Sequence, residues 1–207
     1  EVLLTQDQET AFIKLIDRRL TGEPVAYITG TREFWSMDLI TNKSTLIPRP
    51  DTECLVELVL NQLGHIDNLE VIDLGSGTGA IALALAKEKP TWVVSGVDLS
   101  VDAVDLARQN GKIHQLNVTF SQGNWLENFD RSQFDVIVSN PPYIDHLDPH
   151  LHQGDVRFEP ASALVAGNHG FYDFSKIIKE AKRCLKPGGW IFLEHGYQQQ
   201  AQLCAML

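Results

Sequence analysis

The fold is decided by the stretch Leu69-Glu-Val-Ile-Asp-Leu-Gly-Ser-Gly-Thr-Gly79-Ala80. Its apolar first half, residues 69–74, predicts a buried strand, and the glycines that follow predict a tight turn into a helix that runs to Lys87. Glycines let the backbone approach a ligand closely. A strand, a glycine-rich turn and a helix in this order are typical of the opening unit of a doubly wound nucleotide-binding fold.

The chain beyond this unit alternates between strand-like and helix-like segments. Four further short apolar runs are found at residues 92–98, 118–120, 134–139 and 190–194. Helical patterns lie between them, one capped by Ser100 and one over residues 173–185. This alternation predicts an α/β fold with a doubly wound, mainly parallel, Rossmann-like sheet.

The first 50 residues carry different patterns. Residues 5–20 have apolar side chains at helical spacing behind a Thr5–Gln8 capping box, which predicts an amphipathic helix. Short β-type runs between residues 31 and 47 predict a small hairpin, and Asp51 is the predicted N-cap of the next helix. Three regions are therefore expected: residues 1–24, the last helix of a helical domain; residues 25–50, a linker with the hairpin; and residues 51–207, the nucleotide-binding domain.

Composition and charge narrow the classes of function. The 207 residues are 43% hydrophobic and carry a formal net charge of −10, which argues against broad binding to nucleic acids or anionic membranes. No run approaches the roughly 20 apolar residues of a membrane span, and no signal-peptide pattern is present. We expect a cytoplasmic monomer that makes no direct contact with nucleic acid or membrane.

Metal-ligating residue types do not form a recognisable site in the sequence. The three cysteines, Cys54, Cys184 and Cys204, are scattered, and the loop at residues 145–155 carries His and Asp at irregular spacing. Zinc sites in proteins use Cys and His at short, regular spacings. We expect free thiols in a reducing compartment, no metal ion, and a mobile active-site loop at residues 145–155.

The strand predicted at residues 134–139 runs into Asn140-Pro-Pro-Tyr143. Proline has no N–H and cannot continue a central ladder, so the strand ends there and displays these residues where open α/β sheets bind ligands. The Asn140 side-chain oxygen and the Pro141 carbonyl can accept both hydrogens of a planar NH₂ group, which turns the nitrogen lone pair toward an electrophile. Tyr143 offers a flat face for a planar amide or base.

The candidate cofactor residues favour S-adenosylmethionine over a dinucleotide. The turn at residues 75–80 also fits the dinucleotide fingerprint, and Asp98 lies where a carboxylate accepts hydrogen bonds from ribose hydroxyls, so a NAD-dependent oxidoreductase is an alternative. Asp73, however, is suited to an amine-bearing ligand, and hydride transfer gives the Asn-Pro-Pro-Tyr acceptors no role. S-adenosylmethionine uses all three positions: its amino-acid part at the turn, its ribose at Asp98 and its methyl group beside Asn140.

Two motifs, Asp73-Leu-Gly-Ser-Gly-Thr-Gly79 and Asn140-Pro-Pro-Tyr143, resemble those of class I S-adenosylmethionine-dependent methyltransferases that act on planar nitrogens. A fuller set of segments resembles the HemK/PrmC family of protein-glutamine N5-methyltransferases, which modify peptide-chain release factors. These segments are Gly22-Glu-Pro-Val-Ala-Tyr-Ile-Thr-Gly30, Leu46-Ile-Pro-Arg-Pro-Asp-Thr-Glu53, Arg157-Phe-Glu-Pro160 and Leu193-Glu-His-Gly196. Compared with members of this family, the chain is expected to be a segment: it has only the last helix of the N-terminal domain and lacks the final strands after residues 198–207. Asn124 stands where many relatives carry Asp.

The resemblance implies a reaction and the residues that carry it. The implied substrate is the side-chain amide of the glutamine in a Gly-Gly-Gln loop of a release factor, with S-adenosyl-L-methionine as the methyl donor. The implied catalytic residues are Asn140, Pro141, Pro142 and Tyr143, which also bind the substrate together with Arg49 and Glu159. The expected cofactor-binding residues are Asp73, Gly75, Ser76, Gly77, Thr78, Gly79, Asp98, Leu99, Asn124, Trp125 and Asn140. The large aromatic ring of Trp125 allows two roles, an anchor in the hydrophobic core or a surface against the adenine ring.

Two other functions stay open from the residues alone. The Asn-Pro-Pro-Tyr motif is also similar to that of adenine-N6 nucleic-acid methyltransferases, although the charge of −10 and the absence of a basic, aromatic-laced region argue against that substrate. A non-catalytic cofactor-binding module would give the Asn-Pro-Pro-Tyr motif no role. A turnover assay separates this module from the enzymes.

Overall fold

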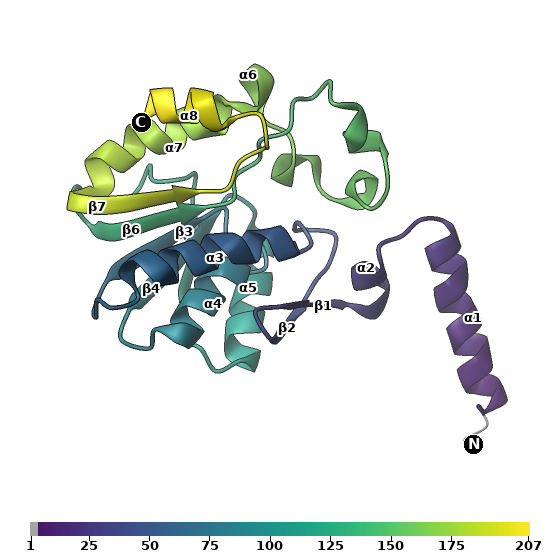
Figure 1. Ribbon diagram of the computed structural model, residues 1–207. Helices are drawn as coiled ribbons and strands as arrows, with labels where there is room; N and C mark the ends of the chain where they lie inside the picture. Colours follow the sequence, from purple (N-terminus) through teal and green to yellow (C-terminus); the bar gives the residue numbers. More distant parts are fainter. Residues whose placement is uncertain (1–3) are drawn as a thin grey trace.

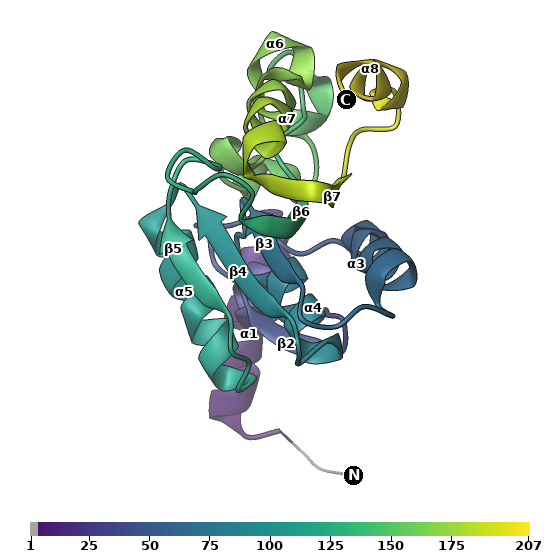
Figure 2. The same ribbon diagram turned by 90° about the vertical axis from the view of Figure 1, so that its left-hand side faces the viewer.

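The computed structural model describes residues 4–207 and contains a five-stranded parallel sheet with helices on both faces (Figure 1, Figure 2). The strand order is β5-β4-β3-β6-β7, so the direction of winding reverses between β3 and β6. The strands are β3 Glu70–Leu74, β4 Val93–Asp98, β5 Thr119–Gln122, β6 Phe134–Ser139 and β7 Leu185–Leu193. The predicted doubly wound α/β fold is confirmed.

Alternation along the strands divides the hydrophobic core into two layers. On β3, Val71 packs in one cluster with residues of α3, α4 and α5, whereas Ile72 packs in the other with residues of α7. These helices are α3 Pro50–Leu63, α4 Ala80–Glu88, α5 Val101–Ile113 and α7 Tyr172–Cys184. Because both faces of β3 are covered, a ligand is accommodated at the carboxyl ends of the strands.

The start of α3 differs from the prediction. Arg49, not Asp51, is the N-cap residue, and Pro50 is the first helical residue. Proline is favoured at this position because its fixed φ suits the helix and its missing N–H would have no helical partner there. Asp51 lies instead in the first turn, where its negative charge is favourable near the helix N-terminus.

Two predicted strands have different boundaries. Residues 45–47 form a loop rather than a strand. The last strand begins at Leu185, directly after α7, instead of at Trp190. Leu185 pairs with Phe134 and Trp190 pairs with Val136, so residues 186–189 bulge out of register. Residues 186–189 separate the predicted helix from the predicted strand, whereas in the structure they lie within β7 as a bulge.

The N-terminal helix α1, Gln6–Leu20, has the predicted capping box: Thr5 Oγ1 accepts from the Gln8 N–H, and Gln8 Oε1 accepts from the Thr5 N–H. Figure 1 shows α1 extending away from the sheet, and none of its residues is buried. Residues 1–3 of the predicted first region lie outside the described residues. The hydrophobic stripe of α1 is therefore uncovered in the part of the chain that the structure describes.

The predicted hairpin is confirmed as β1 Thr31–Phe34 and β2 Met37–Ile40, which pair antiparallel. Asn110 of α5 fixes it to the sheet domain, because its Oδ1 accepts from the Ile40 N–H at 2.8 Å. A short helix before it, α2 Val25–Thr29, was not predicted. Its five residues are too few to show a helical period.

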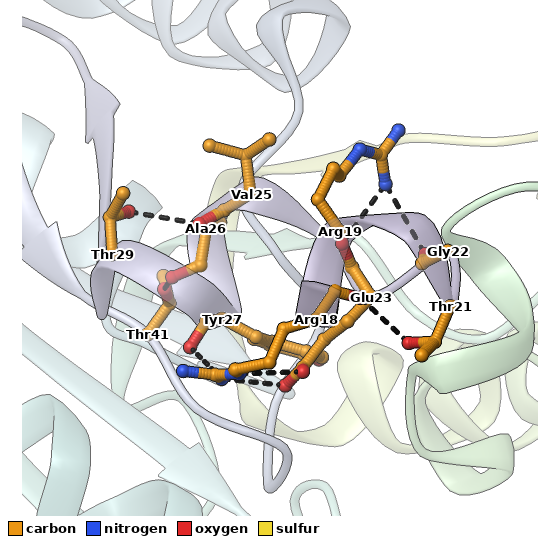
Figure 3. Close-up of polar contacts among 10 residues, drawn as sticks. All are labelled: Arg18, Arg19, Thr21, Gly22, Glu23, Val25, Ala26, Tyr27, Thr29 and Thr41. Carbon is orange, nitrogen blue, oxygen red and sulfur yellow. Dashed lines mark hydrogen bonds and ion pairs between the residues drawn. The ribbon is translucent and has the colours of Figure 1, made fainter. Parts of the chain in front are cut away.

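Arginine side chains hold α1 against α2, as Figure 3 shows. Arg18 donates two hydrogen bonds to the Glu23 carboxylate at 2.9 and 2.8 Å and one to the Tyr27 carbonyl of α2 at 3.2 Å. Arg19 donates to the Glu23 carbonyl at 2.9 Å. Thr41, after the hairpin, donates its hydroxyl to the Ala26 carbonyl at 3.0 Å. These contacts connect α1, α2 and the hairpin.

The long segment between β6 and α7 also reaches this N-terminal region. Arg157 Nη2 donates to the Thr21 carbonyl at 2.9 Å, and Arg19 Nη1 lies 3.2 Å from Asp155 Oδ1. Gly22 has φ +91°, and a Cβ there would collide with the Arg157 guanidinium. The segment contains the short helices η1 Pro149–His152, η2 Val156–Phe158, η3 Ala161–Ala163 and α6 Gly167–Gly170, and the chain ends with α8 Gln200–Met206.

Residues 4–207 contain neither a membrane-spanning helix nor a group of metal-ligating side chains. None of the helices there combines the length and apolar character needed to cross a membrane. Within the same range, His, Cys, Asp and Glu side chains do not gather in groups of three or more that could hold a metal ion.

Candidate functional site

A cavity of about 580 Å³ lies at the carboxyl ends of the parallel strands. The turn after β3, the end of β4 and the segments that follow β5 and β6 all contribute to it. The predicted cofactor residues that line this cavity are Gly75, Ser76, Gly77, Thr78, Asp98, Leu99, Asn124, Trp125 and Asn140. Asp73 and Gly79 of the predicted set are not among its lining residues. Residues predicted from four separate segments are thus brought to one place by the topology of the sheet.

The turn after β3 needs glycine at its first position. Gly75 has φ +72°, and a Cβ there would lie 3.3 Å from the Trp125 ring. The N–H groups of Gly75 and Ser76 both donate to the Val97 carbonyl of β4, at 2.9 and 3.0 Å. The turn is therefore fixed against β4 while its backbone lines the cavity.

Asp98 ends β4 with its carboxylate held by backbone N–H groups. Oδ2 accepts from Gly77 at 2.9 Å and Oδ1 accepts from Ser100 at 2.9 Å. Burial raises the pKa of Asp98, and the hydrogen bonds from Ser100, Gly77 and Leu99 oppose that rise. Each carboxylate oxygen has further lone pairs for a ligand that enters the cavity.

Asp73 lies in the interior of β3, with 1% of its surface exposed. Its Oδ2 accepts from the Ala82 N–H at 3.2 Å, whereas its Oδ1 has no hydrogen-bond partner. Burial raises the pKa of Asp73 to about 7; the Ala82 hydrogen bond opposes this rise, and the nearby Asp98 charge adds to it. Asp73 is not among the residues that line the cavity, so its predicted contact with the cofactor stays a prediction.

Stability of the ligand-free protein should fall as pH rises, in part because of Asp73. The folded-state pKa of about 7 lies above the ordinary value of 3.8. The folded protein therefore retains a proton that the unfolded chain has released, and the free energy of unfolding falls across this range by at most about 1.4 kcal/mol per pH unit from this group. Asp73→Asn should flatten this slope in urea unfolding from pH 4 to pH 8. An identical slope in the variant would contradict the assignment.

Trp125 contributes both to the core and to the cavity. Its ring packs against the second core cluster, and it also lines the cavity. Asp173 of α7 lines the same cavity, where burial raises the pKa of its carboxyl and the nearby Trp125 side chain opposes that rise. The amide of the neighbouring Asn124 donates to Glu127 Oε1. The two interpretations of Trp125 are thus compatible in this structure.

A second cavity of about 300 Å³ lies beside the first. Pro141 and Tyr143 line it, and Asn140, Leu46 and Arg49 line both cavities. Asn140 follows β6, and its Nδ2 donates to Thr52 Oγ1 of α3 at 3.2 Å. The Asn-Pro-Pro-Tyr segment therefore separates a larger cavity from a smaller one. Asn140 faces both.

The predicted substrate residues Arg49 and Glu159 bind each other. The Glu159 side chain is 0% exposed, and its Oε2 accepts from Arg49 Nη2 at 2.5 Å. Its Oε1 accepts from the Ile47 N–H at 3.0 Å. This carboxylate joins the Arg157–Pro160 segment to the start of α3, so Glu159 does not line either cavity. Arg49, 33% exposed, lines both.

Glu159→Ala should destabilise the protein by about 2–4 kcal/mol, because it leaves the Ile47 N–H and the half-buried Arg49 without their acceptor. The matched control is Asp105→Ala, which breaks the exposed Arg108–Asp105 pair and should cost no more than about 1 kcal/mol. Urea unfolding at pH 7 measures both. Equal effects of the two changes would show that the Glu159 contacts do not hold the loop.

Some residues of the site were not predicted from the sequence. Thr52 lines the larger cavity and Glu194 lines the smaller one. Glu194 follows β7 directly, as Asn140 follows β6, so its position at a strand end was the signal available. Thr52 had no such signal, because it is one of many polar residues in α3.

Comparison with known proteins defines first a class and then a family. A methyltransferase domain family matches residues 65–207, and the PrmC N-terminal domain matches residues 1–30. Two solved structures share the fold. A ribosomal protein L11 methylase from Lactobacillus delbrueckii subsp. bulgaricus superposes with a TM-score of 0.57 and is 19% identical; the match covers 77% of this chain and 68% of that one. A putative S-adenosyl-L-methionine-dependent methyltransferase from Methanococcus maripaludis superposes with a TM-score of 0.50 and is 23% identical; the match covers 76% of this chain and 61% of that one. The chain thus belongs to the methyltransferase domain family.

Its relatives are more specific. The release factor glutamine methyltransferase of Aliivibrio fischeri is 53% identical over 205 residues, which cover 98% of this chain and 72% of that protein. The protein of the same name from Escherichia coli is 50% identical over 200 residues, which cover 96% and 72%. This chain belongs to the release factor glutamine methyltransferase family.

Proposed function

We propose that this chain transfers a methyl group from S-adenosyl-L-methionine to the side-chain amide nitrogen, N5, of the glutamine in the Gly-Gly-Gln motif of peptide-chain release factors. The observation that carries the proposal is the position of Asn140, which lines both the larger and the smaller cavity. Transfer between two ligands requires their reacting atoms to be held close together. Membership of the family supports the choice of acceptor.

The larger cavity fits S-adenosyl-L-methionine in its size and in its polar groups. Thr45 Oγ1 and Ser76 Oγ are buried in its lining without hydrogen-bond partners, so a polar ligand would satisfy them. In the proposal, the turn at Gly75–Gly79 holds the amino-acid part, Asp98 accepts hydrogen bonds from the ribose, and Trp125 lies against the adenine ring. Asp73, Leu99 and Asn124 complete the proposed set.

The bound cofactor supplies an electrophilic methyl group on a sulfonium. An amide nitrogen is a weak nucleophile because its lone pair is delocalised, and the Asn-Pro-Pro-Tyr segment contains no strong base. The residues therefore act by position and charge: Asn140 Oδ1 and the Pro141 carbonyl accept the two N–H groups of the glutamine amide and stabilise positive charge that develops on its nitrogen. Pro142 and Tyr143 complete the surface that holds the glutamine.

On the substrate side, the smaller cavity receives the glutamine. Arg49 is proposed to contact the substrate directly because it lines this cavity. Glu159 is proposed to act on the substrate through Arg49, which it binds. The proposed regions stay as predicted: residues 1–24 and 25–50 before a methyltransferase domain at 51–207.

The proposal extends to the setting of the enzyme. Release factors are its protein partners, and it is proposed to act as a monomer in the cytoplasm, without direct contact with nucleic acid. The net charge of −10 supports the last point, because a sequence-independent nucleic-acid surface is basic. Sedimentation of the purified chain, with and without nucleic acid, measures both the oligomeric state and that binding.

The direct test compares two acceptors. Transfer of radiolabelled methyl from S-adenosyl-L-methionine is measured with a release factor that has an intact Gly-Gly-Gln loop and with the same factor carrying a Gln→Ala change in that loop. Label on the intact factor alone is expected. Label on both factors, or on neither when the chain binds the cofactor, would contradict the proposal.

A further inference from the structure

We propose that the Glu194 carboxylate is a positioning group that fixes the orientation of the Asn140 side-chain amide, that is, the direction in which Oδ1 and Nδ2 point. The inference rests on the proposed function, because the orientation matters for turnover only if Asn140 Oδ1 has to accept an N–H from the substrate. An amide has an acceptor on one side and a donor on the other. If it is reversed, it places an NH₂ group against the substrate NH₂ and loses the acceptor.

Glu194 is placed to act on this amide. It lies directly after β7, next to the end of β6, and lines the smaller cavity together with Asn140 and Tyr143. Its Oε1 lies 3.4 Å from the Tyr143 hydroxyl, a long hydrogen bond, and its Oε2 is buried without a hydrogen-bond partner. The carboxylate therefore has acceptor capacity to spare for neighbouring donors.

Three polar side chains face this carboxylate. Burial raises the pKa of Glu194, and the nearby polar groups of Thr52, Tyr143 and Asn140 oppose the rise. Asp51 raises it further, and Arg49 lines the same cavity. A carboxylate without a proton can only accept, so each of the three groups has to present a hydrogen to it.

This requirement sets the orientation of Asn140 through Thr52. If the Thr52 hydroxyl donates its hydrogen to Glu194, the Thr52 oxygen is left to accept a hydrogen from Asn140. The contact from Asn140 Nδ2 to Thr52 Oγ1, at 3.2 Å, has this direction. The reversed amide would place Oδ1 against an oxygen with no hydrogen to offer. Because an unmet buried polar contact is unfavourable, the orientation with Oδ1 directed away from Thr52 is favoured.

The test uses variants of Glu194 and Thr52. Glu194→Met keeps the length of the side chain but removes the acceptor. Thr52→Val removes the hydroxyl at constant shape, and Thr52→Ser restores it. Glu57→Gln, on the exposed side of α3, is the control. For each, we would measure kcat with a release factor, the Kd for S-adenosyl-L-methionine, and the Kd of a Gly-Gly-Gln peptide and of a Gly-Gly-Glu peptide.

Glu194→Met and Thr52→Val should lower kcat about tenfold or more, since the acceptor toward the substrate is no longer fixed, with the cofactor Kd within about threefold. Their preference for the Gln over the Glu peptide should shrink by about tenfold, because a reversed Asn140 offers a donor to the Glu carboxylate. Thr52→Ser should recover most of the kcat and peptide preference lost in Thr52→Val, and the control Glu57→Gln should behave as the wild type. A merely structural role would not change the peptide preference.

The pH profile provides a second readout. Protonation of Glu194 gives it a hydrogen and removes the constraint, so kcat should decline on the acid side in the wild type, and Glu194→Gln should lack that decline. Wild-type kcat and peptide preference in Glu194→Met and Thr52→Val would overturn the inference while leaving the proposed function intact. If the wild type transferred no methyl group, the proposed function would fail, and the peptide preference would still decide the orientation.

Discussion

Asn140→Ala should lower kcat for release-factor methylation by about 10²-fold or more, the scale of losing one oriented polar contact to developing charge. Asn140 faces both cavities, so its side chain is in reach of both ligands. The alanine variant keeps the Pro141 carbonyl but loses the Oδ1 acceptor. Because that acceptor stabilises charge that develops during transfer, kcat should fall far more than the affinity for the cofactor.

Steady-state kinetics with saturating release factor and a separate cofactor-binding measurement check this result. Asn61→Ala, an exposed asparagine on α3, is the matched control and should keep wild-type kcat. Near-normal turnover in Asn140→Ala would eliminate the acceptor-pair mechanism, since the proline side chains have no acceptor and the Tyr143 hydroxyl is directed to Glu194.

Asp98→Ala should raise the Kd for S-adenosyl-L-methionine by about 10²-fold. Hydrogen bonds to a charged group contribute about 1.5–3 kcal/mol, and every 1.4 kcal/mol changes a Kd tenfold. Asp98 is held in place by Gly77 and Ser100, so its carboxylate does not have to be ordered when the cofactor binds. Calorimetric titration of the cofactor into the variant measures the change.

The control for Asp98→Ala is Asp102→Ala, which removes an exposed carboxylate from the first turn of α5. Its cofactor Kd should stay within about twofold of the wild-type value. Urea unfolding of both variants verifies that they are folded. A cofactor affinity in Asp98→Ala equal to that of the control would show that the ribose is not recognised by β4.

The sequence predicts those parts of the site that depend on local chemistry. A strand, glycines at a turn, and Asp98 at the next strand end are read in order along the chain, and the parallel sheet then brings their carboxyl ends together. Asn140 was predictable for the same reason, because the two prolines stop β6 where the strand meets the cavity.

Contacts between distant segments were not predictable in this way. Glu159 binds Ile47 and Arg49 across more than a hundred residues, and a resemblance that marked Arg49 and Glu159 as substrate contacts did not indicate that they bind each other. Thr52 and Glu194 meet the Asn-Pro-Pro-Tyr segment for an equally non-local reason: α3 lies alongside β7, and β7 pairs with β6. The start of β7 was predicted too late in the sequence, because a bulge lets the strand include Lys186-Pro-Gly-Gly189.

The most direct measurement is the location of the transferred methyl group in a release factor, by fragment-ion mass spectrometry of its Gly-Gly-Gln peptide after incubation with this chain and S-adenosyl-L-methionine. The account predicts one added methyl group on the side-chain nitrogen of the glutamine, and none when Asn140→Ala replaces the wild type over the same time. A methyl group on another residue, or undiminished modification by Asn140→Ala, would contradict it.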